Sequence, residues 1–138
     1  MKKNSLIPYE TDASQLVGKT TKVFFPKKIE ELQEIIRQSA SLNIRGGGTG
    51  LAGGAVPQKE ETIDLSKIDQ IINFNKDKQT ITVETGIILD DLQNFLKKYS
   101  LEFPINPSSH SVCTIGGMIA TNAVGSRAIK YGKTSDWI

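Results

Sequence analysis

Glycine residues gathered in one short stretch are the part of this sequence whose type and spacing most directly suggest chemistry. Residues 46–54 read GGGTGLAGG, and they lie between predicted strands rather than in a polar Gly/Ser tract. Glycine lets backbone N–H groups turn into one concavity and lets an anion come close to them. The stretch therefore predicts a loop that binds phosphate or pyrophosphate, although its composition alone also fits a flexible surface loop.

Neither of two standard nucleotide-binding motifs is present in this sequence, although parts of both can be found. Gly48, Gly50 and Gly53 satisfy G-x-G-x-x-G, but that fingerprint requires a helix to begin at the third glycine. A polar run and a proline follow instead, with no apolar helical stripe. Farther along, residues 132–134 read GKT like the end of a Walker A loop, but Arg127 stands where its first glycine is needed.

A second glycine-containing segment, residues 114–125, reads TIGGMIATNAVG. Thr114 is a candidate N-cap for a short helix, and small residues follow where a ligand could lie against that helix. Taken alone, such a segment is more often a tightly packed core helix. The two glycine segments together are more specific than either one.

The elements that must position these two segments follow from the spacing of apolar residues. Helical spacing predicts helices over residues 28–42 and 88–99. β-rich runs predict short strands at residues 20–25, 43–45 and 62–65, and a hairpin of residues 70–74 and 80–84 about a turn at 75–78. The resulting order of strands and helices predicts a mixed α/β (α+β) fold.

Length and composition limit the classes of protein. The chain has 138 residues, enough for one domain with a hydrophobic core. Its 17 lysine and arginine residues against 15 acidic residues give a net charge of +2, too balanced for a protein that binds nucleic acid. A single cysteine and a single histidine exclude an internal disulfide framework and a zinc site of paired cysteines, and they argue against a complete Ser-His-Asp triad. The N-terminus lacks the apolar run of a secretory signal and no stretch is long enough to span a membrane, so we expect a cytoplasmic chain.

The paired motifs carry a family resemblance. RGGGTGLAGGAVP, followed later by TIGGMIATNAVGSRAIKYGKTSDWI, resembles the FAD-linked oxidase domain of the vanillyl-alcohol-oxidase (p-cresol methylhydroxylase-type) superfamily. The most similar branch is that of the glycolate oxidase and D-lactate dehydrogenase flavoproteins, and the resemblance covers about residues 18–138. It implies the p-cresol methylhydroxylase-type FAD-binding fold, truncated before its last strands. Trp137 and Ile138 likewise look like a strand that the chain enters and does not complete.

The resemblance implies a cofactor site made from both glycine segments. In this family the first loop holds the FAD pyrophosphate through backbone N–H groups, a role that falls here to Gly46, Gly47, Gly48, Thr49, Gly50 and Leu51. The later region lines the ribityl chain and the flavin, and it matches here Pro107, Ser108, Ser109, Thr114, Gly116, Gly117, Ala120, Asn122, Gly125, Tyr131 and Gly132. The sequence assigns no catalytic residue and no metal ligand.

Several positions depart from the family pattern. The family often has aspartate at the position of Asn106 and asparagine at the position of Met118. Glycine is common at the position of Val124 and proline at the position of Ser126. Thr49 stands where some relatives link FAD to a histidine, so we expect FAD to bind non-covalently. Cys113 is expected to pack as a small apolar residue, and His110 to lie in a polar surface loop.

The resemblance implies the FAD-binding part of an oxidoreductase that oxidises a 2-hydroxy acid, of the D-lactate or glycolate type, by hydride transfer to FAD. We expect a lead-in segment at residues 1–19 and an incomplete FAD-binding domain at residues 20–138, without the substrate domain of family members. A second hypothesis is a non-catalytic split or truncated nucleotide-binding subunit that needs a partner chain or self-association. A third is the UDP-N-acetylenolpyruvoylglucosamine reductase branch of the same superfamily, which the GGGTGLAGG form of the first loop disfavours.

Overall fold

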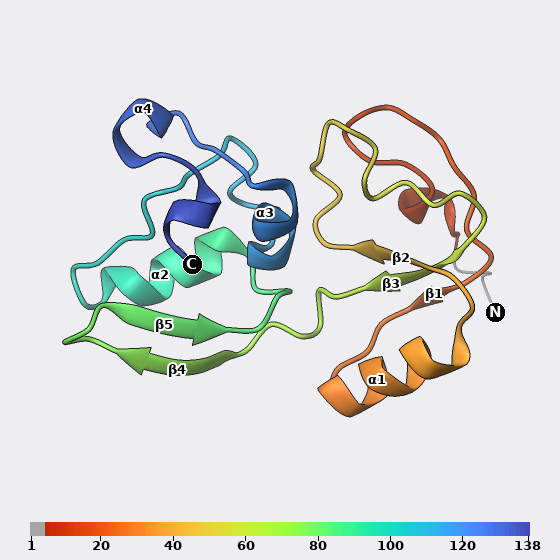
Figure 1. Cartoon of the computed structure of the whole chain (residues 1–138), viewed down its shortest axis with the longest axis horizontal. Coiled ribbons are helices and arrows are strands. Elements are labelled where there is room, and N and C mark those ends of the chain that lie inside the picture. The colour runs from red at the N-terminus through yellow and green to blue at the C-terminus, as the bar shows by residue number, and fades with distance from the viewer. Residues whose placement is uncertain (1–4) are drawn as a thin grey trace. The chain divides into compact units, whose positions relative to one another are not determined.

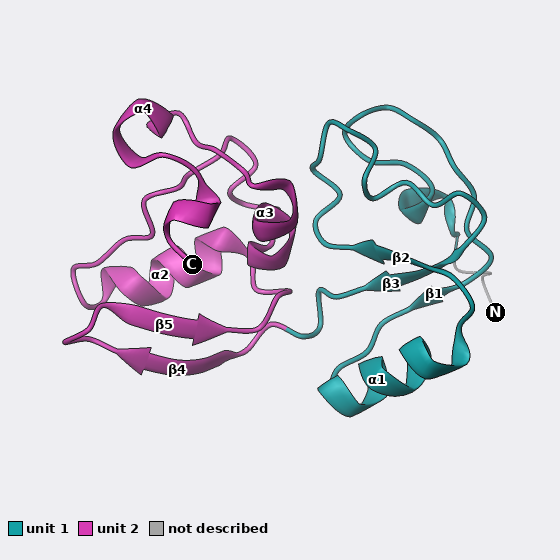
Figure 2. Ribbon diagram, in the orientation of Figure 1, with its two compact units in different colours: residues 1–68 teal, residues 69–138 magenta. Residues whose placement is uncertain are grey.

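The chain divides into two compact units, with the boundary between Ile68 and Asp69 (Figure 2). The computed structural model describes residues 5–138. Each unit has strands and helices of its own, and the predicted mixture of helix and strand is confirmed in both. The residues predicted as a polar lead-in before residue 20 belong, as far as they are described, to the first unit.

The first unit is built on a three-stranded parallel sheet (Figure 1). Its elements are a short 3-10 helix η1 (Ile7–Tyr9), β1 (Val23–Phe24), α1 (Ile29–Gln38), β2 (Leu42–Arg45) and β3 (Glu61–Asp64). The strand order is β1-β3-β2, and β3 pairs in parallel with both neighbours. Since β3 is the central strand, its residues Thr62, Ile63 and Asp64 are buried.

Helix α1 is shorter than the helix predicted over residues 28–42. It ends at Gln38 because Ser39 has an extended backbone (φ −96°, ψ 135°) and Leu42 already pairs with Glu61 in the sheet. The apolar residues of α1 recur at helical spacing as predicted, but none of them is fully buried. The strands predicted near residues 20–25, 43–45 and 62–65 are confirmed, with bounds that differ by a few residues.

The second unit packs helices against an antiparallel hairpin. Its elements are β4 (Ile71–Asn75), β5 (Thr80–Val83), α2 (Leu89–Lys97), α3 (Ile115–Thr121), α4 (Ala128–Tyr131) and a 3-10 helix η2 (Thr134–Asp136). Helix α2 lies along the hairpin (Figure 1), and the Phe95 ring of α2 meets the Phe74 ring of β4 edge-on at 5.3 Å. Leu89, Leu92 and Leu96 of α2 are buried in the core of this unit.

The hairpin and α2 confirm the sequence prediction closely. The turn begins at Asn75, whose side-chain oxygen accepts a hydrogen bond from the Lys78 N–H at 2.9 Å. Gln79 then takes a left-handed backbone (φ 53°) that leads into β5. Such Asn-initiated turns are a usual way to reverse a strand, which is why the polar run was recognisable.

The prediction of a strand beginning at Trp137 is wrong. Trp137 follows η2, and its backbone N–H donates to the Thr134 carbonyl at 3.0 Å. Its indole Nε1 donates to the Tyr131 carbonyl at 2.8 Å. The aromatic residue therefore closes a local turn around α4 and η2, and the apolar character of residues 137–138 does not reflect strand pairing.

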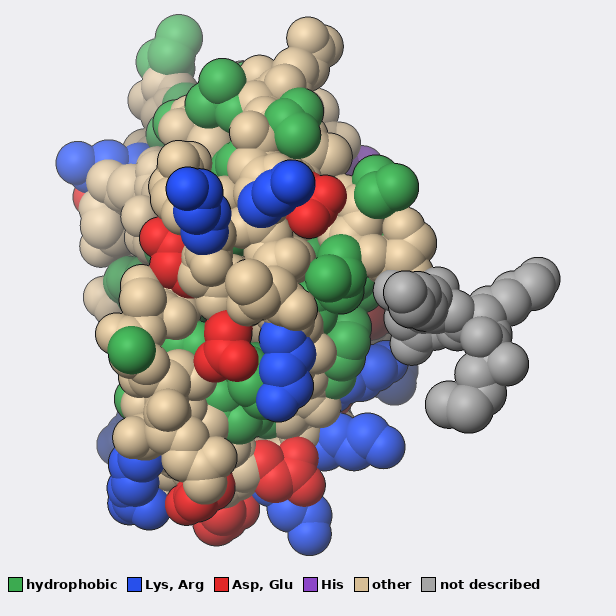
Figure 3. Space-filling view, turned by 90° about the vertical axis from the view of Figure 1, so that its right-hand side faces the viewer, with side chains coloured by type: hydrophobic (Ala, Val, Ile, Leu, Met, Phe, Trp, Pro, Cys, Tyr) green, Lys and Arg blue, Asp and Glu red, His purple; other side chains and the backbone are tan. Residues whose placement is uncertain are grey.

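Charged side chains of both signs are mixed on the molecular face drawn in Figure 3. Lysine and arginine side chains lie beside aspartate and glutamate on this face, with hydrophobic side chains between them. A surface of mixed charge produces only a weak net field. On this face, attraction of an anion must depend on local hydrogen-bond donors rather than on a concentrated positive charge.

Candidate functional site

The loop that follows β2 is the strongest candidate site. Residues 46–54, hereafter the glycine loop, leave the carboxyl end of β2 immediately after Arg45 and continue through bends and a turn. No helix begins between residues 46 and 60, so the G-x-G-x-x-G match is a false one, as predicted. The carboxyl ends of parallel strands are where open α/β sheets commonly bind ligands.

The backbone N–H groups of the glycine loop are free. Among the hydrogen bonds of residues 5–138, none has the N–H of any of residues 46–54 as its donor. The loop does accept hydrogen bonds through its carbonyls: from the Ala13 N–H to Gly48 at 3.1 Å, from the Val56 N–H to Gly53 at 3.0 Å, and from the Asn43 side-chain amide to Gly54 at 3.5 Å. A run of unused donors is the feature that a pyrophosphate requires of a protein backbone.

The loop also leaves room for a ligand. A Cβ atom built at Gly50 would meet no other atom within 4 Å, and its φ is not in the left-handed region. Glycine is therefore not required at this position by the fold itself. Free donors beside open space fit the phosphate groups of a nucleotide cofactor, so the residues present suit the group that the sequence implied.

Arg45 holds the two ends of the glycine loop together. Its Nη1 donates to the Ala55 carbonyl at 3.3 Å and to the Thr11 carbonyl at 2.8 Å. The guanidinium fills the space beside Gly48, where any Cβ atom would collide with it and where the backbone is left-handed (φ 64°). Gly48 is thus needed for the shape of the loop, whereas Gly50 is not.

Asp12 holds the same loop from the other side. Its Oδ2 accepts the Ala55 N–H at 3.3 Å, and its Oδ1 accepts the Ser14 N–H at 2.9 Å and the Ser14 hydroxyl. Burial acts to raise the pKa of this carboxyl, but the hydrogen bonds from Ser14 and Ala55 and the charge of Arg45 outweigh burial and lower the pKa. Asp12 is therefore a carboxylate at neutral pH.

Asp12, Ser14 and the contacts of Arg45 were missed in the sequence because they depend on tertiary structure. The residues of the lead-in show little hydrophobic periodicity, so their spacing does not predict a structural role. Two signals were present: Thr-Asp-Ala-Ser is a run of turn-forming residues, and Arg45 is the charged residue next to the glycines. Neither signal says which distant backbone groups those side chains contact.

The second glycine segment is built differently. Thr114 caps α3 as predicted, its hydroxyl oxygen accepting the Gly117 N–H at 3.2 Å. The Gly116 N–H donates to the Thr85 carbonyl at 2.8 Å, and the Met118 N–H to the Thr114 carbonyl at 2.9 Å. The backbone N–H groups of residues 115–118 are therefore used within the unit.

Two glycines of this region are required by close packing. A Cβ at Gly116 would lie 2.7 Å from the Thr85 Cβ, and one at Gly125 would lie 2.6 Å from the backbone nitrogen and oxygen of Asn106. Carbon atoms do not approach so closely, so neither site can hold a larger residue without movement of the backbone. This observation supports the alternative that the segment is a packed core element.

Two further predicted cofactor residues lie at the C-terminal ends of α3 and α4. Asn122 ends α3 in a left-handed conformation, and its side-chain oxygen accepts the Ser135 N–H at 3.0 Å. Gly132 is also left-handed (φ 74°) and donates to the Ala128 carbonyl at 2.8 Å. Other residues of the predicted set are exposed or half-buried, namely Pro107, Ser108, Ser109, Ala120 and Tyr131.

The predicted cofactor residues fall into two groups. Residues 46–51 share the glycine loop of the first unit, and residues 107–132 lie in the second unit. The first group is one continuous stretch, whereas the second is spread over the loop before α3, α3 itself, and α4 with the turns on either side of it. A single cofactor site formed by both groups stays a prediction from the resemblance.

Cys113 is buried, as predicted, and belongs to the core of the second unit. Burial raises the pKa of the Cys113 thiol, and a weaker hydrogen bond with Ser109 opposes this effect. A protonated, buried thiol is a poor nucleophile. Packing is thus the role that the structure gives this residue.

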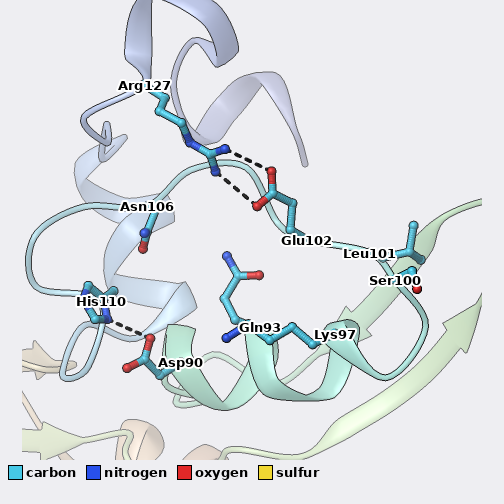
Figure 4. Close-up of a pocket in the computed structure, with 9 residues that line it drawn as sticks. All are labelled: Asp90, Gln93, Lys97, Ser100, Leu101, Glu102, Asn106, His110 and Arg127. Atoms are coloured by element: carbon cyan, nitrogen blue, oxygen red, sulfur yellow. Dashed lines mark hydrogen bonds and ion pairs between the residues drawn. The ribbon is translucent and has the colours of Figure 1, made fainter.

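His110 is a half-exposed residue that lines a polar pocket of about 650 Å³ in the second unit (Figure 4). Its Nδ1 donates to Asp90 Oδ1 at 2.8 Å, while Arg127 donates to both carboxylate oxygens of Glu102 at 3.1 and 3.3 Å. These bonds to Glu102 raise the pKa of Arg127. None of the predicted cofactor residues lines this pocket, so it is not the predicted FAD site.

Neither a metal centre nor a membrane span was found in the part of the chain that the structure describes. Within residues 5–138 no group of three or more His, Cys, Asp or Glu side chains is placed to hold a metal ion. Over the same residues no helix is both long and apolar enough to cross a membrane.

Comparison with known proteins relates the chain to dehydrogenases. It is 36% identical over 121 residues to a D-2-hydroxyglutarate dehydrogenase of Xanthomonas citri pv. viticola, covering 84% of this chain and 26% of the relative. It is 35% identical over 117 residues to a D-lactate dehydrogenase of Archaeoglobus fulgidus, covering 82% and 26%. The chain thus spans about a quarter of the length of these relatives.

The fold is shared with a solved enzyme structure. Alkyldihydroxyacetonephosphate synthase superimposes with a TM-score of 0.74 at 23% identity, over 83% of this chain and 24% of the synthase. This likeness confirms the FAD-binding fold that the sequence implied. The protein-family model described as FAD binding domain matches residues 20–138. The chain therefore belongs to the FAD-binding domain family, whose cofactor is FAD.

Proposed function

We propose that this chain is the FAD-binding part of a flavin-dependent dehydrogenase that oxidises a 2-hydroxy acid. The observation that carries the proposal is the run of backbone N–H groups in residues 46–51 that donate to no described residue, beside the open space at Gly50. The printed names of the relatives, D-2-hydroxyglutarate dehydrogenase and D-lactate dehydrogenase, support the substrate class. A D-lactate- or glycolate-type acid is the substrate proposed from the resemblance.

In this proposal the first part of the glycine loop, residues 46–51, holds the pyrophosphate with uncharged donors. Backbone N–H groups do not titrate and bring no side-chain bulk, so they bind a dianion over a wide range of pH. FAD, when bound, supplies the group that accepts a hydride from the substrate carbon. The residues proposed to line its ribityl chain and flavin are those of the second unit, between Pro107 and Gly132.

Binding is proposed to be non-covalent. Thr49 cannot form the bond that a histidine forms with FAD in some relatives. Cys113, the other residue considered for a covalent bond, is buried and its raised pKa keeps the thiol protonated. Acid precipitation of the loaded protein should therefore release all of the flavin into the supernatant.

The experiment that tests the function is a titration with three probes: FAD, ADP and riboflavin. FAD and ADP share the pyrophosphate, whereas riboflavin lacks it, so ADP should compete with FAD and riboflavin should bind far more weakly. Quenching of flavin fluorescence measures the binding of FAD and of riboflavin. Calorimetry measures the binding of ADP. Equal affinity for riboflavin and FAD would contradict the proposed role of the loop.

A matched pair of variants locates the site. Gly50→Val and Gly54→Val both place a side chain in open space, since neither glycine has an atom within 4 Å of a built Cβ. Gly50→Val should weaken FAD binding by about tenfold or more, because the side chain takes the space of the phosphate. Gly54→Val lies outside the residues assigned to the pyrophosphate and should bind FAD as the parent chain does.

The 138-residue chain alone is proposed not to turn over substrate. No base with an orienting partner was found at the predicted cofactor residues, and the chain spans about a quarter of its relatives. We propose that a further polypeptide region, a partner chain or self-association supplies the rest. An assay with D-lactate, glycolate and D-2-hydroxyglutarate and an artificial electron acceptor tests this, and light scattering measures association. The cytoplasmic location also stays a prediction.

A further inference from the structure

A segment before β1 lies along the glycine loop. Residues 11–16, hereafter the backing segment, contact the loop and the residues beside it at several places. Thr11 and Asp12 bond to Arg45 and Ala55, and the Ala13 N–H bonds to the Gly48 carbonyl at 3.1 Å. A Cβ at Gly53 would lie 2.7 Å from Leu16 Cδ1, so the segment packs closely on the far part of the loop as well.

The backing segment is itself held in shape by local hydrogen bonds. Asp12 accepts from Ser14, the Leu16 N–H donates to the Ser14 hydroxyl at 3.2 Å, and the Thr11 hydroxyl donates to the Leu16 carbonyl at 2.8 Å. The turn fixes the Asp12 carboxylate with one oxygen toward Ser14 and the other toward Ala55. Its orientation therefore does not depend on a ligand.

We propose that Asp12 and Arg45 are positioning residues that fix the glycine loop in its binding shape before FAD arrives. The inference rests on the proposed function of the loop. Asp12 acts through the Ala55 N–H, and Arg45 acts through the carbonyls of Thr11 and Ala55. Ordering a glycine-rich loop is entropically costly, and a loop ordered in advance binds its ligand more tightly.

Asp12 offers the sharper test, because losing its charge and losing its hydrogen bonds should change the affinity for FAD in opposite directions. The Asp12→Asn variant removes a negative charge from the neighbourhood of an anionic ligand, which by electrostatics alone would tighten FAD binding. It also replaces a carboxylate that accepts three hydrogen bonds by a neutral amide, which would loosen the loop. Weaker binding therefore indicates positioning.

The control is Glu10→Gln, an acid-to-amide change in the same part of the chain. The Glu10 carboxylate accepts the Thr20 N–H at 3.4 Å and bonds to no residue of the glycine loop. We expect Asp12→Asn to raise the Kd for FAD and for ADP by about tenfold, and Glu10→Gln to leave both unchanged. Raising the salt concentration should not remove the difference between the two variants, since it depends on loop geometry.

The possible outcomes separate this inference from the proposed function. If the parent chain binds neither FAD nor ADP, the proposed function fails and the positioning role fails with it. If the parent binds FAD and Gly50→Val does not, but Asp12→Asn binds as tightly or more tightly, only the positioning role is overturned. If Asp12→Asn does not fold by circular dichroism, Ser14→Ala decides: FAD binding weakened about threefold supports the role, and unchanged binding overturns it.

Discussion

In the glycine loop the N–H groups of residues 46–54 donate to nothing in the described part of the chain, whereas in the second glycine segment those of residues 115–118 are all donated within the unit. Gly50 faces open space, whereas Gly116 and Gly125 lie against the backbone or side chains of other residues. Two stretches that look alike in sequence thus use glycine for two purposes. One provides donors and room for a ligand, and the other allows segments of the core to approach closely.

The comparison predicts its largest effect at Gly125. The Gly125→Ala variant places a Cβ 2.6 Å from the Asn106 backbone and should lower the free energy of unfolding by about 1–3 kcal/mol. Gly50→Ala, the matched change in the glycine loop, should alter it by less than about 0.5 kcal/mol. Denaturant unfolding measures both. Equal losses in the two variants would remove the distinction between the segments.

Amide hydrogen exchange should show the next difference. In the free chain the N–H groups of residues 46–50 should exchange fast, and the Gly116 N–H, bonded to Thr85, should exchange slowly. Added FAD should slow exchange in residues 46–50 by about tenfold or more, since new hydrogen bonds form there. Unaltered exchange in the loop at saturating FAD would contradict the assignment of the pyrophosphate.

Acid should affect the glycine loop through Asp12. Its pKa is below the ordinary value of 3.8, so its contribution to stability is fully present above that value and is lost as pH falls through the folded pKa. FAD affinity should therefore hold from neutral pH to about pH 4 and fall below it. Asp12→Asn lacks this step, and the difference between the two pH profiles isolates Asp12 from the other carboxylates.

The smallest effect is expected at Cys113. Because the residue packs in the core and contributes no ligand, Cys113→Ala should leave FAD affinity unchanged and cost about 1 kcal/mol of stability. Fluorescence titration and thermal unfolding check the two parts. A loss of bound flavin in this variant would return Cys113 to the cofactor site.

The sequence predicted the elements whose signal is local. Period-2 and helical spacing located the hairpin and α2 because their buried faces, such as Leu89, Leu92 and Leu96, repeat regularly. The end of α1 was placed too late, because the pairing of Leu42 with Glu61 is a tertiary contact that competes with helix propensity. At Trp137 the reason is different: its apolar character resembles that of a strand, whereas its bonds to Thr134 and Tyr131 form a local turn.

For the site, the sequence located the glycines but not what holds them. A glycine run is visible without a structure, and the proline and polar residues that follow it already argue against a Rossmann-type helix. Asp12 and Arg45 contact Ala55 across 43 and 10 positions of the chain. Such contacts have no periodic signature, so the sequence of the lead-in does not predict a part in the site.

The order of strands in the first unit also governs how it can fold. β3 is the shared partner of β1 and β2, and β2 reaches it through the connection that contains the glycine loop. β2 cannot pair with β3 until that connection has closed, and closing a glycine-rich connection costs conformational entropy before any contact compensates for it. The glycine loop is therefore ordered as β2 pairs with β3, so a variant that hinders its closure should slow refolding of this unit even when no cofactor is present.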